Sequence, residues 1–151
     1  MQDTVSARTP AHLWIVGILA LVWNCLGAAD YVMTRMRNTG YLESMMPGSD
    51  PNEVLAYIDS FPIYAQIGWG LGVWGGLLGA VLLLLRSRWA TMAFAVSLIG
   101  AVLGLGYQIM NPGGPAEMHE GIGGIIPYVI ILVCAGLVAY AHTMQKKGVL
   151  R

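Results

Sequence analysis

Charged residues are scarce in this chain. Asp, Glu, Lys and Arg make up only 11% of its 151 residues, against roughly 25% in a typical soluble domain. The charges also cancel to a net charge of zero, which gives no reason to expect a nucleic-acid partner. The two cysteines, Cys25 and Cys134, each fall within an apolar run, so we expect reduced, buried thiols. There is no Cys-x-x-Cys, phosphate-binding glycine loop or hydrolase serine motif, and no cofactor is predicted.

Charges are missing above all from four long apolar runs, at residues 12–33, 62–85, 89–110 and 121–142. A helix of 22 residues spans ~33 Å, about the thickness of the hydrocarbon core of a bilayer. Asp30 is the one charged side chain inside these runs, whereas the helices of a water-soluble bundle carry charges along one face. The sequence therefore predicts an all-α polytopic membrane protein. Its partner is the lipid bilayer, and residues 1–151 form a single bundle of four transmembrane helices.

The cations indicate how this bundle is oriented. Four spans put both termini and the 86–88 loop on one side of the membrane, together with most of the cations: Arg8, Arg86, Arg88, Lys146, Lys147 and Arg151. Arg35 and Arg37 lie on the other side with all the acids except Asp3. The positive-inside rule then places both termini in the cytoplasm. Small residues before Asp30 resemble a signal-peptide cleavage site. Because the preceding run is long and contains Asn24, we interpret it as a retained span.

A short amphipathic helix is predicted at residues 51–60, in the outer connection between the first two spans. Asp50 is a suitable N-cap and Pro51 suits the first helical position. Val54, Leu55 and Ile58 then recur at helical spacing, which gives the helix one apolar face. We expect this helix either to lie on the outer membrane surface or to cap the bundle.

Glycines are concentrated in the second span and mark a helix-packing surface. They repeat in the small-x-x-x-small pattern that allows two helices in a membrane to approach closely: Gly68, Gly72, Gly75, Gly76 and Gly79. The approaching helix could belong to this chain or to another one. We expect the chain to form a homo-oligomer or to associate with a partner membrane subunit.

Four polar side chains within or beside the spans are candidates for lining a cavity: Asn24, Asp30, Gln66 and Gln108. Gln66 and Gln108 should lie at similar depth, with Asn24 ~10 Å deeper at helical rise. We therefore expect an outward-open vestibule lined by Asp30 and the two glutamines and narrowing toward Asn24. The alternatives are local: an amide bonded to a neighbouring helix or backbone carbonyl, and a surface ion pair of Asp30 with Arg35 or Arg37.

The last outer loop holds the one compact set of metal-capable side chains, Glu117, His119 and Glu120. Carboxylates and imidazoles can bind a divalent cation, but the spacing fits no established metal motif and the loop is rich in glycine and proline. A solvated loop with acids at a helix N-terminus is the alternative, and no metal is predicted. An enzyme would have to combine these residues with Asp30, which favours a non-enzymatic function.

Three segments resemble a known family: WNCLGAADYVMTR at 23–35, WGLGVWGG at 69–76 and LLLRSRWA at 83–90. They are similar to small four-span proteobacterial inner-membrane proteins that are uncharacterised or labelled "sugar transporter". The resemblance implies four spans in a bacterial inner membrane, and its label favours transport. Two functions are therefore expected, in this order: a small-solute transporter or conduit, and a structural or accessory subunit of a larger membrane complex. The accessory subunit would dock through the glycine surface and the outer helix.

Overall fold

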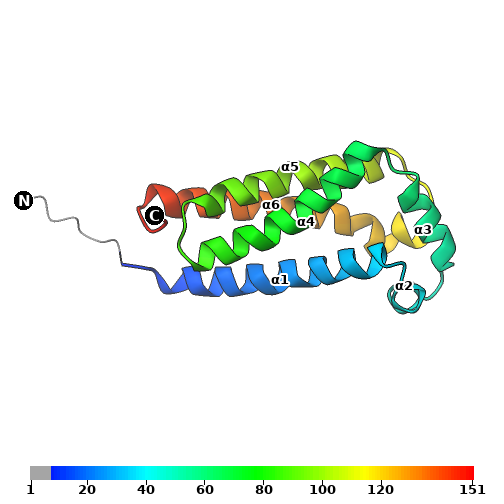
Figure 1. The fold of residues 1–151 in the computed structure, drawn as a ribbon, viewed down its shortest axis with the longest axis horizontal. Helices are drawn as coiled ribbons and strands as arrows, with labels where there is room; N and C mark the ends of the chain where they lie inside the picture. The colour runs from blue at the N-terminus through cyan, green and yellow to red at the C-terminus, as the bar shows by residue number, and fades with distance from the viewer. Residues whose placement is uncertain (1–7) are drawn as a thin grey trace, which may run out of the picture.

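The four apolar runs form four long helices that lie side by side (Figure 1). The computed structural model describes residues 8–151. The long helices are α1 (Ala11–Arg35), α4 (Ile63–Leu84), α5 (Trp89–Met110) and α6 (Gly121–Lys146). Their ends agree with the predicted spans to within a few residues, and all four are long and apolar enough to cross a membrane. The chain is thus an all-α, multi-pass membrane protein. Asp3, expected on the inner side, lies outside the described residues.

The helices pack in the order α1, α4, α5, α6. The pair α4 and α5 makes the most extensive contact, α1 packs on α4, and α6 packs on α5. The short Arg86–Arg88 connection explains why α4 and α5 are antiparallel neighbours. Glycines allow their close approach. A Cβ atom built on Gly72 would lie 3.2 Å from the backbone nitrogen of Ala101, and one on Gly75 would lie 3.1 Å from that of Ser97.

All five glycines of the packing surface face partners inside the chain. Gly68 faces Gly100 and Gly104 of α5, and Gly79 lies against the ring of Phe94. Gly76 faces both Asn24 of α1 and the Ser97 hydroxyl of α5. This glycine stripe of α4 is therefore covered by neighbouring helices of the same chain.

Three short helices close the end of the bundle where α1 ends and α4 begins, which we call the outer end: α2 (Thr39–Met45), α3 (Pro51–Asp59) and the 3-10 helix η1 (Ala116–Met118). The predicted outer helix is α3, and the Asp50 carboxylate caps it by accepting a hydrogen bond from the Asn52 backbone N–H at 2.9 Å. Leu42, Val54 and Leu55 are buried together between α2 and α3. Because both short helices turn their apolar sides toward this cluster, they cap the bundle.

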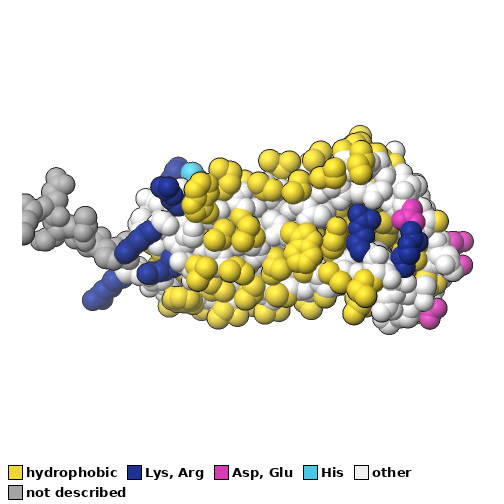
Figure 2. Space-filling model, in the orientation of Figure 1, with side chains coloured by type: hydrophobic (Ala, Val, Ile, Leu, Met, Phe, Trp, Pro, Cys, Tyr) yellow, Lys and Arg dark blue, Asp and Glu magenta, His cyan; other side chains and the backbone are white. Residues whose placement is uncertain are grey.

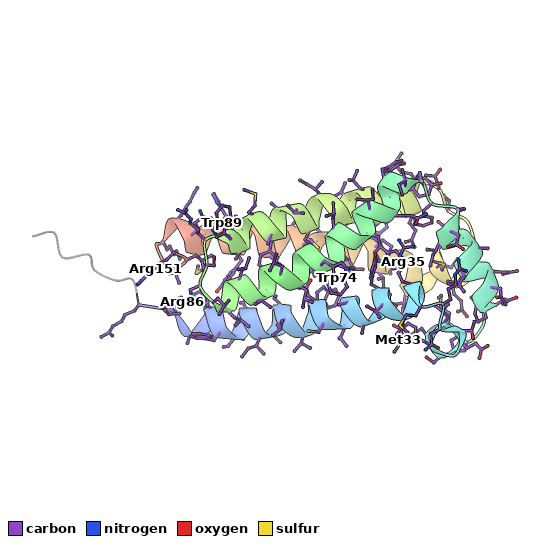
Figure 3. All side chains as sticks on the ribbon, in the orientation of Figure 1. Met33, Arg35, Trp74, Arg86, Trp89 and Arg151 are labelled. Carbon is purple, nitrogen blue, oxygen red and sulfur yellow. The ribbon has the colours of Figure 1, made fainter. Side chains whose placement is uncertain are left out.

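The opposite end of the bundle is closed by a dense apolar core. Leu13, Leu83 and Phe94 are essentially inaccessible to solvent, and the core extends to Met144 and Leu150. The chain after α6 folds back onto this end, where the Arg88 N–H donates to the Arg151 carbonyl and the Arg151 N–H donates to the Arg86 carbonyl, at 2.9 and 2.8 Å. Figure 3 shows Arg86 and Arg151 together at this end.

The charged side chains gather at the two ends, with a broad apolar band between them (Figure 2). Of the two cations on the outer side, Arg37 forms an ion pair with Asp59 at 2.6 Å. Arg35 stacks over the rings of Tyr31 and Trp69, with its guanidinium carbon 5.6 and 5.4 Å from the ring centroids. Each of these two cations thus has a specific partner at the outer end of the bundle.

Candidate functional site

A cavity of about 510 Å³ lies under the outer cap. Side chains of α1, α4, α5 and α6 form its walls, and α2, α3 and η1 contribute its roof. Most of the lining is apolar and includes Met45, Met46, Met118, Ile126 and Ile130. The volume is within the range of ordinary ligand sites, and such sites combine an apolar wall with a few polar groups. The polar groups of this wall are therefore the first candidates for function.

Asp30 is the charged group of the α1 wall. The Tyr41 hydroxyl of α2 donates a hydrogen bond to Oδ1 of Asp30 at 2.8 Å. Burial, and then the hydrogen bond with Asp30 and the charge of Asp30, raise the pKa of Tyr41 to about 12. Tyr41 is therefore a protonated donor at neutral pH. The alternative, an ion pair of Asp30 with an arginine, is not what the structure shows, because Arg37 pairs with Asp59 and Arg35 donates to Gln66.

Within the described residues, one oxygen of Asp30 and three further polar side chains of the cavity have no hydrogen-bond partner. Within residues 8–151, no hydrogen bond reaches Oδ2 of Asp30, the Thr34 hydroxyl or the Gln108 amide, and the Trp69 indole N–H donates none. Thr34 is only 5% exposed and lies one helical turn from Asp30, so both occupy the same face of α1. Gln108 reaches the cavity from α5 and also lines a smaller cavity of about 110 Å³. Polar groups beside apolar walls need partners, which a bound molecule or water can supply.

The other two predicted cavity residues lie elsewhere. Gln66 donates to the Phe61 carbonyl at 2.9 Å and accepts a hydrogen bond from Arg35 at 3.3 Å, so it joins α4 to α1. Asn24 donates to the Ala20 carbonyl of its own helix at 2.8 Å. Its Oδ1 lies against Gly76, deep between α1 and α4. The structure thus brings Asp30 and Gln108 to one cavity, and gives both remaining amides backbone partners.

Glu117 and His119 hold the outer loops together. The Glu117 carboxylate accepts hydrogen bonds from the Gly48 N–H at 3.0 Å and the Ser49 hydroxyl at 3.1 Å, which ties η1 to the α2–α3 connection. Nε2 of His119 contacts the backbone of Gly113. Glu120 precedes α6 and is exposed. Within the described part of the chain, no three His, Cys, Asp or Glu side chains are placed to share a metal ion.

Sequence reasoning missed Thr34 and Trp69 as cavity residues. Thr34 could have been found, because it follows Asp30 by four residues and so shares its helix face. Trp69 could not, because its position depends on where α4 meets Gly104 of α5. Comparisons of the chain with models of protein families, with curated proteins and with solved structures gave no match.

Proposed function

We propose that this chain is a multi-pass protein of the bacterial inner membrane that binds a small solute in its outer cavity as a step of transport. The cavity carries this proposal. Its Asp30 oxygen, Thr34 hydroxyl and Gln108 amide face a mostly apolar space and have no partner in the described part of the protein. A solute that satisfies them would gain hydrogen bonds that are strong in such surroundings. The resemblance to proteins labelled as sugar transporters favours the same function.

The proposed orientation places the cavity on the periplasmic side and both termini in the cytoplasm. The support is the distribution of cations, because Arg86, Arg88 and the cations after α6 lie at the opposite end from the cap. A solute would thus reach the cavity from outside. The core around Phe94 and Leu13 separates it from the cytoplasm, so complete transport would require this core to open.

The alternative function, an accessory subunit, receives less support. Its two expected docking surfaces are the glycine stripe of α4 and the outer helix α3. The first packs on α5 and α1, and the second buries Val54 and Leu55 within the cap. A second copy or a partner subunit would have to use other surfaces.

Solute uptake by reconstituted vesicles tests the proposal. Leu105→Trp should fill the cavity, because Leu105 is part of its wall. Ile99→Trp adds the same side chain to the same helix at a position that is 60% exposed. Suitable labelled solutes are glucose, phenylethylamine and succinate, which are neutral, cationic and anionic at neutral pH.

We expect at least one of these solutes to enter faster than into protein-free vesicles. Leu105→Trp should abolish the difference and Ile99→Trp should preserve it. Uptake that is equally fast with Leu105→Trp would show that the cavity is not on the path. No uptake of any of the three would contradict a transport function for the isolated chain.

A further inference from the structure

The charges around the cavity have one sign. Asp30 and Glu117 line it, and no Lys, Arg or His of the described residues does so. Glu117 has its two oxygens bonded to the α2–α3 connection, whereas Asp30 keeps one oxygen unpaired. A carboxylate beside apolar walls attracts a cation more strongly than it would in water. The bound group is therefore expected to be positively charged.

Three of the unpaired polar groups offer acceptors that a cationic group can use. Oδ2 of Asp30, the Thr34 hydroxyl and the Gln108 side-chain carbonyl can each accept a hydrogen bond. The Tyr41 hydroxyl already donates to Oδ1 of Asp30, so Oδ2 is the oxygen that has no partner among the described residues. A primary ammonium has three N–H donors and no acceptor, which matches three acceptors in number and in charge.

The rest of the cavity fits an apolar body. Three of the lining side chains are methionines, Met45, Met46 and Met118, and methionine adapts readily to irregular shapes. Ile126 and Ile130 of α6 add rigid apolar surface. Such a lining would leave most hydroxyls of a sugar without partners, at a cost for each buried polar group. An anionic molecule would meet two carboxylates.

We propose that the cavity binds an amphiphilic primary amine, with its ammonium between Asp30, Thr34 and Gln108 and its apolar part among the methionines and isoleucines. This ligand class rests on the proposed solute-binding function. Two sources share this chemistry: a free amphiphilic amine and the headgroup of phosphatidylethanolamine.

Calorimetric titration of the full chain in phosphatidylcholine nanodiscs tests the ligand class. The probes are 4-phenylbutylamine and 4-phenylbutan-1-ol, which share a skeleton and differ in the charge of the polar end. Asp30→Asn removes the charge but keeps an oxygen for Tyr41. Glu43→Gln is the matched control, because Glu43 is an exposed acid of α2 outside the cavity. Thr34→Val is a second, nearly isosteric variant, and Leu105→Trp blocks the cavity.

We expect the amine to bind the wild-type chain about tenfold more tightly than the alcohol, as one charge-assisted hydrogen bond allows. Asp30→Asn should remove this preference and Thr34→Val should reduce it, while Glu43→Gln should leave it intact. Leu105→Trp should abolish binding of both probes.

The failures of the two proposals can be told apart. Equal binding of both probes, lost in Leu105→Trp, would overturn the ligand class and leave solute binding in place. A preference for the amine that persists in folded Thr34→Val and Asp30→Asn would likewise overturn the ligand class and leave solute binding in place. Binding of neither probe would overturn both. Nanodiscs with phosphatidylethanolamine then identify the source: competition with the amine indicates the lipid headgroup, and unchanged affinity indicates a free amine.

Discussion

Gly68→Ala should loosen the contact between α4 and α5. A Cβ atom at this position would lie 2.7 Å from the Cβ of Leu103, 2.9 Å from the Gly100 carbonyl oxygen and 3.0 Å from the Gly104 nitrogen. Non-bonded carbon atoms are at their best near about 3.5–4.0 Å. Because two of the three contacts are backbone atoms of α5, no side-chain rotation can relieve them. The two helices must separate by roughly half an ångström or more, and overpacking of this kind costs about 1–3 kcal/mol.

Gly106→Ala is the matched control for this substitution. Gly106 lies in α5, and nothing lies within 4 Å of the Cβ that would be added. Both variants gain helix propensity, up to about 1 kcal/mol in water, so their difference isolates the packing cost. Reversible unfolding in mixed detergent micelles, followed by far-UV circular dichroism, should show Gly68→Ala less stable than Gly106→Ala by ~1–3 kcal/mol. Equal stability would refute the close α4–α5 contact.

Three further predictions concern other parts of the protein. Leu150→Ala should cost about 2–5 kcal/mol in the same unfolding assay, since Leu150 is 4% exposed in the core. Because the pKa of Tyr41 rises from 10.0 to about 12 on folding, its protonated form stabilises the protein fully below pH 10, and this stabilisation is lost as the pH rises through 12. Tyr41→Phe should remove that dependence from the unfolding midpoint. In a cysteine-free background, an impermeant maleimide added to intact cells should label Ser44→Cys and leave Ser87→Cys unlabelled; the reverse pattern would contradict the proposed orientation.

The long helices could be predicted because the membrane constrains them so strongly. In a bilayer every backbone polar group must be satisfied within its segment, so an uninterrupted apolar run of this length forms a helix. The outer helix α3 was also predictable, from the capping Asp50 and from Pro51 at its first position. Helix α2 was not predicted. It has seven residues with Gly40 among them, and its N-cap is Asn38, whose side chain accepts from the Tyr41 N–H.

The candidate site could be predicted only in part, because depth along a helix and direction around it are different quantities. Gln66 and Gln108 were expected at similar depth and Asp30 at the mouth of the same vestibule, and all three do lie near the outer end. The direction in which each side chain points relative to the cavity depends on which helix packs beside it. Arg35, held over Tyr31 and Trp69, meets Gln66 on the α1 side of α4. Gln108 extends from α5 toward α6 and the cap. Helical periodicity within one segment does not contain that information.

The position of the cavity follows from where the helices are held together. Glycines allow α4 and α5 to pack closely along their length. Helix α1 packs on α4, and α6 packs on α5. At the end opposite the cap, a single core that contains Leu13 of α1 and Met144 of α6 joins them. At the outer end α2 and α3 cover the space between them. Asp30 and Thr34 on α1 therefore face Gln108 across an apolar interior. A loss of the α4–α5 contact would disturb this arrangement without altering any residue of the site.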